Sequence, residues 1–337
     1  MTRAAPPGPI VRLLPALLLT LLGACDNSGP AVSPTTTEAA ALNAWPRSVP
    51  GNHDAVYLER PPQRIVSTSV TLTGTLLTIN APIIASSTSQ PNSSVTDDLG
   101  FFRQWSSIAK ARGVIPLYQG EADAEAIAAM APDLIIVAGS GGDSALKLYE
   151  QLQLIAPTLV VNYDDKSWQE LALLLGRASG HEADAQRMIA DFAAQVASTR
   201  QRLTLPAQPS SALTYYEDGS GANLWTITSA QGQLLRDLGF TLAPVPETVK
   251  GHITQGLRKD IIQLSGEHFA EGLQGQSLLL FSAEQDSVDK LLRNPFLTSL
   301  PAVQKSQVYA TGLDTFRLDY YSSVNLLTRL EKHFGRP

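Results

Sequence analysis

A long amphipathic segment in the middle of the chain constrains the fold most. Apolar side chains recur there at helical spacing, at Ala185, Met188, Ile189, Phe192, Val196 and Leu203. The pattern predicts a helix over residues 182–203, about 20 residues and near 30 Å long. It does not continue over the three or four heptads that a coiled coil needs. A single helix of this length is typical of a connection between two folded parts.

Short apolar runs on both sides of this helix are typical of buried strands. Most are continuous β-branched or aliphatic runs, as expected where an α/β layer structure covers both faces of a sheet. Four precede the helix and three follow it, at residues 64–67, 83–86, 134–138, 158–162, 212–216, 278–282 and 308–311. Helical patterns separate them, at residues 124–131, 143–152, 167–175, 230–238 and 319–334. The chain is therefore predicted to form two α/β halves.

The N-terminus has the pattern of an export signal. Arg3 and Arg12 precede an apolar run of about ten residues that ends in small residues, and this run is too short for a permanent membrane span. The following Leu-Gly-Ala-Cys resembles the lipobox of bacterial lipoproteins, which implies cleavage after residue 24 and lipid on Cys25. An ordinary cleaved signal followed by a chance cysteine is the alternative.

Composition places the rest of the chain among globular proteins. The sequence is 44% hydrophobic and 17% charged, and no later stretch approaches the length of a membrane span. Once Arg3 and Arg12 leave with the signal, 23 basic residues remain against 31 acidic ones, a formal charge of −8. This balance argues against nucleic acid as a general partner. Cys25 is the single cysteine, which excludes a disulfide framework and a Cys-based metal cluster.

Residues 26–44 are rich in Ser, Thr, Pro, Ala and Asn, a composition typical of a flexible tether. With this segment and the central helix as landmarks, the chain divides into five parts. We predict a lipoprotein signal peptide (1–24), a lipidated N-terminus and tether (25–58), an N-terminal α/β lobe (59–180), an inter-lobe helix (181–205) and a C-terminal α/β lobe (206–337).

Several motifs resemble one family of binding proteins, those that deliver iron siderophores, haem or cobalamin to ABC importers. The general ones are QRIV at 63–66, APDLII at 131–136 and LPAV at 300–303. Others resemble the subgroup for ferric catecholates: IVSTSVTLTG at 65–74, FRQW at 102–105, GGDSA at 141–145, NYDDKSW at 162–168, ANLW at 222–225 and TFRLDYYS at 315–322. The resemblance covers about residues 60–334. It implies two Rossmann-like lobes joined by a single long α-helix, the helical-backbone (class III) periplasmic binding protein type, with little hinge motion.

The ligand implied by this resemblance is a ferric catecholate siderophore of the enterobactin type. Such a complex is a trianion with three aromatic faces, and its iron is already bound by six oxygens. The protein then needs cations, donors and aromatic surfaces, and neither a cofactor nor metal ligands of its own. Candidate ligand-binding residues are Thr68, Ser69, Arg103, Trp225, Arg258, Arg317 and Tyr321.

The three arginines among these candidates have plainer alternatives. Arg103 is either a cleft cation or a surface arginine beside core aromatics, and Arg317 either meets the ligand or forms a local pair with Asp319. Arg258, next to Lys259, either closes on the ligand or belongs to a solvated face. Trp225 follows a Gly-rich stretch and is read as a loop indole that stacks on a catechol. Thr68 and Ser69 follow a predicted strand end, where open α/β sheets bind ligands.

The resemblance also implies partners. Family members present one acidic residue on each lobe to basic sockets of the permease, and the matching positions are Glu125 and Glu267. Ordinary acids at helix N-termini would look the same in sequence. The expected partners are the ABC permease and ATPase complex, and the expected state is a monomer. The expected location is a membrane surface, reached through lipid on Cys25 and facing the periplasm or the outside of the cell.

Other chemistry has weak support. The glycine-rich run at 139–144 lacks the third glycine of a dinucleotide loop, and the hydrolase and P-loop motifs do not occur. The five histidines are scattered without ligand spacing. A receptor for haem, cobalamin or a hydroxamate siderophore and an extracytoplasmic enzyme acting on an anionic aromatic compound remain as alternatives.

Overall fold

The computed structural model describes residues 44–250, 260–266 and 268–336 of the chain. Residues Asn43–Pro337 form one unit, separate from Met1–Leu42, and the description below concerns this unit alone. Among the described residues, no helix combines the length and the apolar character that crossing a membrane requires.

The first lobe is built on a five-stranded sheet in the order β5-β4-β3-β6-β7, and every neighbouring pair is parallel. Its strands are β3 (Ile65–Ser67), β4 (Ile83–Thr88), β5 (Ile115–Gln119), β6 (Leu134–Ala138) and β7 (Thr158–Val161). Its helices are α2 (Val70–Thr78), α3 (Arg103–Ala111), α4 (Ala124–Ala129), the 3-10 helix η1 (Leu146–Leu148), α5 (Tyr149–Gln153) and α6 (Trp168–Ser179). Because helices cover the sheet, strands such as β6 are buried along their whole length.

The second lobe has a five-stranded sheet in the order β10-β9-β8-β11-β12. Its strand β9 runs antiparallel to both neighbours. A short turn with Gly219 at φ +75° joins β9 to β8 without a crossover helix, which makes this pair antiparallel. The strands are β8 (Ser210–Tyr215), β9 (Gly221–Trp225), β10 (Ile261–Ser265), β11 (Ser277–Leu280) and β12 (Val308–Ala310). The helices are α8 (Ala230–Asp237), α9 (Glu247–Lys250), α10 (His268–Glu271), α11 (Gln285–Leu292), η2 (Pro295–Leu297), α12 (Pro301–Gln304) and η3 (Leu313–Thr315).

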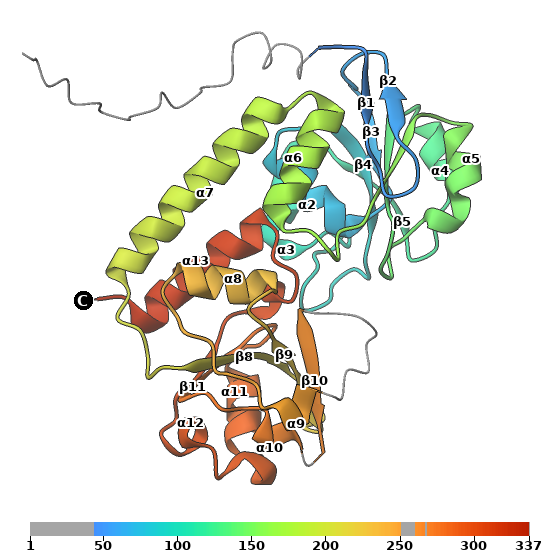
Figure 1. Ribbon diagram of the computed structural model, residues 1–337. Helices are drawn as coiled ribbons and strands as arrows, with labels where there is room; N and C mark the ends of the chain where they lie inside the picture. Colours follow the sequence, from blue (N-terminus) through green and yellow to red (C-terminus); the bar gives the residue numbers. More distant parts are fainter. Residues whose placement is uncertain (1–43, 251–259, 267, 337) are drawn as a thin grey trace, which may run out of the picture. The chain divides into compact units, whose positions relative to one another are not determined.

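The predicted inter-lobe helix is present as α7 (Glu182–Arg202), which runs between the two sheets along one side of the unit (Figure 1). It is accompanied by a second helix, α13 (Tyr320–Phe334), which packs against α7, α2 and α3. Thr199 and Arg202 of α7 both bond to the carboxylate of Glu331 on α13. Buried side chains of α13, including Leu326 and Phe334, join one apolar cluster that extends from the first lobe into the second. The lobes are thus held together by two helices and a shared core.

A small N-terminal hairpin packs against the start of α7. Its strands, β1 (Arg47–Val49) and β2 (Val56–Leu58), are antiparallel. Arg47 is only 7% exposed, pairs with Glu182 and lies 4.0 Å from the centre of the Trp45 ring. The predicted tether, 25–58, is therefore wrong over the hairpin, because a buried, paired arginine binds these residues to the fold.

The secondary structure also differs from the prediction in two ways. The predicted helix 143–152 is replaced by η1 and α5, so residues 143–145 precede the helical part, and Asp143 instead bonds to neighbouring loops. The sequence patterns did not reveal β5, β9 or β10, nor α2, α3 and α11.

Candidate functional site

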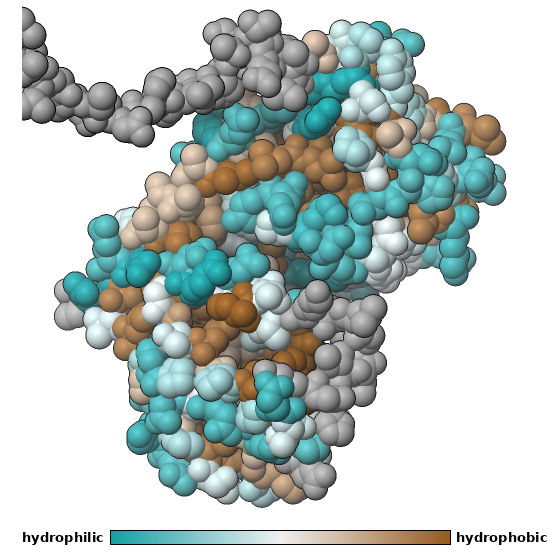
Figure 2. All heavy atoms as spheres, viewed as in Figure 1, coloured by the Kyte–Doolittle hydropathy of each residue, from teal (hydrophilic) through white to brown (hydrophobic). Residues whose placement is uncertain are grey.

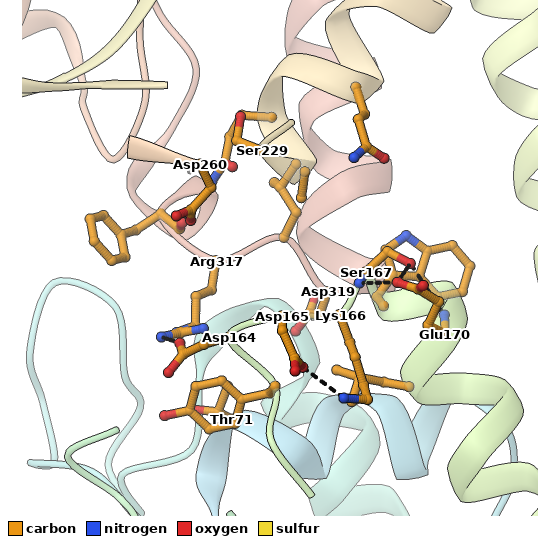
Figure 3. Close-up of a pocket in the computed structure, with 18 of the residues that line it drawn as sticks. Thr71, Asp164, Asp165, Lys166, Ser167, Glu170, Ser229, Asp260, Arg317 and Asp319 are labelled. Atoms are coloured by element: carbon orange, nitrogen blue, oxygen red, sulfur yellow. Dashed lines mark hydrogen bonds and ion pairs between the residues drawn. The ribbon is translucent and has the colours of Figure 1, made fainter. Parts of the chain in front are cut away.

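A cleft of about 880 Å³ lies between the lobes, a size suited to a small-molecule ligand. Its first wall comes from the start of α2, from α3 and from the β7–α6 loop. Its second wall comes from the end of β9, the loop before α8 and the η3–α13 connection. Figure 3 shows Arg317 and Asp260 on one side of this space, with Thr71 and Asp164 on the other. Sequence positions 71 and 317 thus contribute to a single site.

The position of the cleft follows from the topology of the first sheet. Parallel strands end at one edge, and residues after the ends of neighbouring strands meet there. Ser140 follows β6 and Asp164 follows β7, and the hydroxyl of Ser140 lies 2.6 Å from the carboxylate of Asp164. The cleft therefore opens at the edge where these strands end, and ligand binding at this edge stays a prediction.

Arg317 is the cation at the centre of the site. Its guanidinium pairs with the carboxylate of Asp164 at 2.5 Å and lies 4.1 Å from the centre of the Tyr163 ring. The side chain remains 38% exposed to the cleft. A guanidinium has five N–H donors, so the single bond to Asp164 leaves donors for a ligand.

Asp319 is not the partner of Arg317, contrary to the local pair considered from sequence. Its carboxylate caps α13 by accepting the backbone N–H of Ser322 at 2.7 Å, and it also accepts from the side chain of Gln104 at 3.3 Å. Burial raises the pKa of Asp319. The carboxyl group of Asp319 therefore acts as the N-cap of α13 and does not pair with Arg317.

Charge in the described cleft lining is mainly negative, and most of it has local partners. Lys166 binds its neighbour Asp165 at 2.6 Å. Glu170 closes a capping box with Ser167 at the start of α6. The charged residues of the described lining are Asp164, Asp165, Lys166, Glu170, Asp260, Arg317 and Asp319. An anionic ligand would therefore depend on where the cations lie, because the total charge of these residues does not attract it.

The second wall of the cleft contributes two aromatic side chains, Trp225 and Phe316. Trp225 is the last residue of strand β9, not a loop residue as predicted, and it is 4% exposed. Gly221, which was predicted to belong to a loop, is the first residue of this strand. The indole N–H donates to the hydroxyl of Thr214 at 3.2 Å, and the ring meets Phe316 edge to face at 5.4 Å. Phe316 is 38% exposed, so it offers more ring surface to the cleft than Trp225 does.

Thr68 and Ser69 are buried, and their hydroxyls already have partners. The hydroxyl of Thr68 donates to the carbonyl of Ile136 at 3.2 Å. The hydroxyl of Ser69 donates to Asp143 at 2.6 Å. These two residues support the wall of the cleft, whereas Thr71, two residues after Ser69, lines it.

Arg103 and Tyr321 lie outside the cleft lining. The guanidinium of Arg103 is exposed and donates to the carbonyl of Ser93 at 3.1 Å, while its neighbours Phe102 and Gln104 face the cleft. Tyr321 is partly buried in α13, and this burial raises the pKa of its hydroxyl. Ligand contact by Arg103 or Tyr321 remains a prediction that the geometry does not favour.

The remaining predicted residues fall at other positions. Glu125 is exposed in the first turn of α4, whose N-cap is Asp123. Cys25, Arg258 and Glu267 lie outside the described residues. Within residues 44–250, 260–266 and 268–336, no group of three or more His, Cys, Asp or Glu side chains is placed to hold a metal ion.

A second, more apolar hollow of about 620 Å³ adjoins the cleft beside α7. Figure 2 shows hydrophobic side chains, in brown, between α6 and α7. Trp168 and Leu318 line both spaces, so the two meet there. The apolar part of its lining includes Ile189, Phe192, Val196 and Leu234.

Tyr163, Asp164 and Phe316 are site residues that the sequence analysis did not assign. Tyr163 and Asp164 follow the end of β7 by two and three residues, so the same strand-end argument that selected Thr68 and Ser69 could have selected them. Phe316 immediately precedes Arg317, and the 38% exposure that distinguishes it from a core residue is a property of the folded chain.

Comparison with known proteins identifies the family. Residues 65–315 match the model of a family described as periplasmic binding protein. The chain belongs to this periplasmic binding protein family. Membership indicates a location outside the cytoplasm, and the two-lobed α/β architecture agrees with the fold expected from sequence.

Named relatives of this periplasmic binding protein include one that binds ferric enterobactin, according to its name. The chain is 54% identical over 297 residues to the ferric enterobactin-binding periplasmic protein FepB of Escherichia coli O6:H1 (strain CFT073), covering 88% of this chain and 93% of the relative. The crystal structure of holo-ViuP matches with a TM-score of 0.78 and 33% identity, covering 87% and 96% of the two chains. Staphylococcus aureus SirA complexed with staphyloferrin B shares the fold, at a TM-score of 0.64, 19% identity and coverage of 85% and 97%.

Proposed function

We propose that this protein captures a ferric catecholate siderophore of the enterobactin type and delivers it to the permease of an ABC importer. The observation that carries the proposal is the 54% identity to ferric enterobactin-binding FepB across nearly the whole of both chains. The bound molecule is cargo, and its iron is held by the siderophore.

The chemistry of the cleft supports this ligand. Arg317 supplies a guanidinium that is 38% exposed, and each charge-assisted hydrogen bond to an anion contributes about 1.5–3 kcal/mol once water is excluded. Phe316 and the edge of Trp225 supply aromatic surface against which a catechol ring can pack. Thr71 and Gln231, which also line the cleft, supply polar groups around this surface.

Delivery is proposed to involve an acidic residue on each lobe. Glu125 is exposed at the start of α4, which directly precedes strand β6 of the first sheet. Glu267 directly precedes α10 in the sequence, and α10 leads to strand β11 of the second sheet. Because the two sheets have corresponding strand orders, the two glutamates hold equivalent positions in the chain topology. This correspondence supports docking to a permease with two related halves.

We further propose that Cys25 carries lipid and holds the protein at a membrane surface. The support is the sequence Leu-Gly-Ala-Cys after a short apolar run that follows Arg3 and Arg12. Two or three acyl chains on one cysteine would give stable attachment, since each buried methylene contributes about 0.8 kcal/mol.

Intrinsic tryptophan fluorescence tests the ligand directly, because Trp168 and Trp225 both line the cleft. Titration with ferric enterobactin should quench the emission at micromolar or lower concentrations, whereas a ferric hydroxamate and haem should not. Absence of quenching by the ferric catecholate would refute the proposal. Recovery of chemically unchanged ligand after prolonged incubation is the expected outcome for a binding protein.

A further inference from the structure

Two loops at the carboxyl end of the first sheet support the guanidinium of Arg317. The β6–η1 loop, residues 139–145, has the glycine-rich sequence that resembled a dinucleotide loop, and the β7–α6 loop carries Tyr163 and Asp164. The two loops bond to each other through Ser140 and Asp164 and through Asp143 and Tyr163. The function proposed above assigns nothing to the glycine-rich loop.

Tyr163 is held firmly beneath the guanidinium. Its hydroxyl donates to a carboxylate oxygen of Asp143 at 2.7 Å, and the residue is only 5% exposed. Burial, and then the charge of Asp143, raises the pKa of the Tyr163 hydroxyl, so it stays protonated and donates. The ring is therefore a fixed surface.

Asp143 is fixed in turn by the start of α2. Its second carboxylate oxygen accepts from the hydroxyl of Ser69 at 2.6 Å and from the backbone N–H of Thr71 at 3.1 Å. With the hydroxyl of Tyr163, three donors hold this one side chain. A rigid element of the first lobe thus determines where the Tyr163 ring lies.

The glycine at position 141 makes this arrangement possible. Gly141 has a φ of +88°, and a Cβ placed there would lie 1.7 Å from the Tyr163 hydroxyl and 3.2 Å from Asp143. Any other residue would both strain the backbone and displace the tyrosine. The loop therefore needs glycine in order to hold Tyr163, which gives its sequence a physical reason other than nucleotide binding.

We propose that Tyr163 is a positioning residue that holds Arg317 for an anionic ligand through the 4.1 Å contact between ring and guanidinium. Exposure distinguishes the positioning residue from the residue that meets the ligand, because Tyr163 is 5% exposed and the Arg317 side chain is 38% exposed. The guanidinium thus meets the ligand, and the ring beneath it supplies attraction without a competing charge. The ligand part of this inference rests on the proposed function.

A double-mutant cycle tests the inference with ferric enterobactin as the probe. Tyr163→Leu should weaken binding by about 3- to 30-fold in the parent protein. In the Arg317→Ala background the same change should alter binding by less than about 2-fold, since it acts through the missing guanidinium. Tyr163→Phe keeps the ring and should restore most of the affinity. Tyr57→Leu, at a tyrosine 60% exposed on β2, is the matched control and should leave binding unchanged.

Equal losses from Tyr163→Leu in both backgrounds would overturn the inference, because the tyrosine would then act on the ligand or on the fold directly. So would a Phe variant as weak as the Leu variant. A ligand-free measurement separates this inference from the proposed function. ¹⁵N relaxation of the Arg317 Nε–H should report an ordered side chain in the parent and Phe variants and a mobile one in the Leu variant. An ordered Arg317 in the Leu variant would refute the positioning role even if the parent protein bound no catecholate.

Discussion

The guanidinium of Arg317 lies 2.5 Å from the carboxylate of Asp164, although the two residues are 153 positions apart in the chain. Asp164 belongs to the loop after β7 of the first sheet, and Arg317 belongs to the connection between η3 and α13. The pair therefore spans the cleft. In the absence of ligand, a protein carboxylate occupies part of the surface of the cation that an anionic ligand would use.

Asp164→Asn should strengthen the binding of ferric enterobactin. The variant removes a negative charge that both neutralises Arg317 and repels a trianion. Because the pair is about one third exposed, the gain should be modest, about 2- to 5-fold at low ionic strength, and smaller at high salt. Fluorescence titration measures it, with Asp286→Asn on α11 as a control for total charge. Weaker binding by Asp164→Asn would mean that the carboxylate supports Arg317 for the ligand.

Arg317→Ala should weaken ferric enterobactin binding by roughly 10- to 150-fold. The variant loses at least one charge-assisted hydrogen bond, worth about 1.5–3 kcal/mol. The matched control is Arg187→Ala on α7, which removes a half-exposed arginine paired with Asp184 away from the cleft. Similar affinities of the two variants in the same titration would remove Arg317 from the ligand site.

Glu331→Gln should lower the free energy of unfolding at neutral pH by about 0.5–1 kcal/mol. The hydroxyl of Thr199, and then Arg202, lowers the pKa of Glu331 from its ordinary value of 4.5, against the opposing effect of burial. A lowered pKa in the folded state means that ionised Glu331 stabilises the fold above about pH 4.5, and this contribution disappears as pH falls through the lowered pKa.

Chemical denaturation at about pH 7 and about pH 3 measures this effect. The difference between Glu331→Gln and the parent protein should be present at the higher pH and smaller at the lower one. Because Glu331 joins α13 to α7, an equal difference at both pH values would show that packing, not the charge, stabilises this contact.

Joint replacement of Glu125 and Glu267 by alanine should leave ferric enterobactin affinity unchanged and abolish uptake. Glu125 is exposed and lies outside the cleft lining, so its removal changes no ligand contact. Radiolabelled iron uptake by cells that express the variant with its importer measures delivery. Normal uptake would refute the docking assignment.

Cys25→Ser should release the protein from the membrane fraction while leaving ferric enterobactin binding intact. Serine cannot carry the thioether-linked lipid that the sequence at 22–25 implies. Fractionation of cells followed by immunoblotting is the measurement. A serine variant that remained with the membranes would exclude lipidation as the means of attachment.

Much of the architecture was accessible from sequence because it depends on local pattern. The stripe of apolar residues in 182–203 corresponds to α7, and the continuous apolar run at 134–138 corresponds to β6. Strand β9 was missed because the glycine that begins it and the polar Asn223 within it do not resemble a buried strand. Pairing with β8 and β10 makes that segment a strand, and sequence spacing does not reveal such pairing.

The residues of the site also fall into those that the sequence indicated and those that it did not. Arg317 and Trp225 were selected from residue type and motif, and both line the cleft. Arg103 has the same residue type and a similar aromatic neighbourhood, yet its guanidinium bonds to the carbonyl of Ser93 instead. Arg103 is the first residue of α3, and its side chain lies outside the cleft lining. Which side of a helix faces a cleft depends on how the helix packs in the whole lobe.

The sequence by itself determined the two α/β halves, the long helix between them and the family to which the chain belongs, because periodicity and motifs are properties of neighbouring residues. Only the tertiary structure decided what Arg317 touches. Its contacts with Tyr163 and Asp164 arise where the ends of strands in one lobe meet a connection that follows the last strand of the other. Distances between residues far apart in the chain are set by the packing of sheets and helices. That packing places Tyr163 and Asp164 around the guanidinium of Arg317.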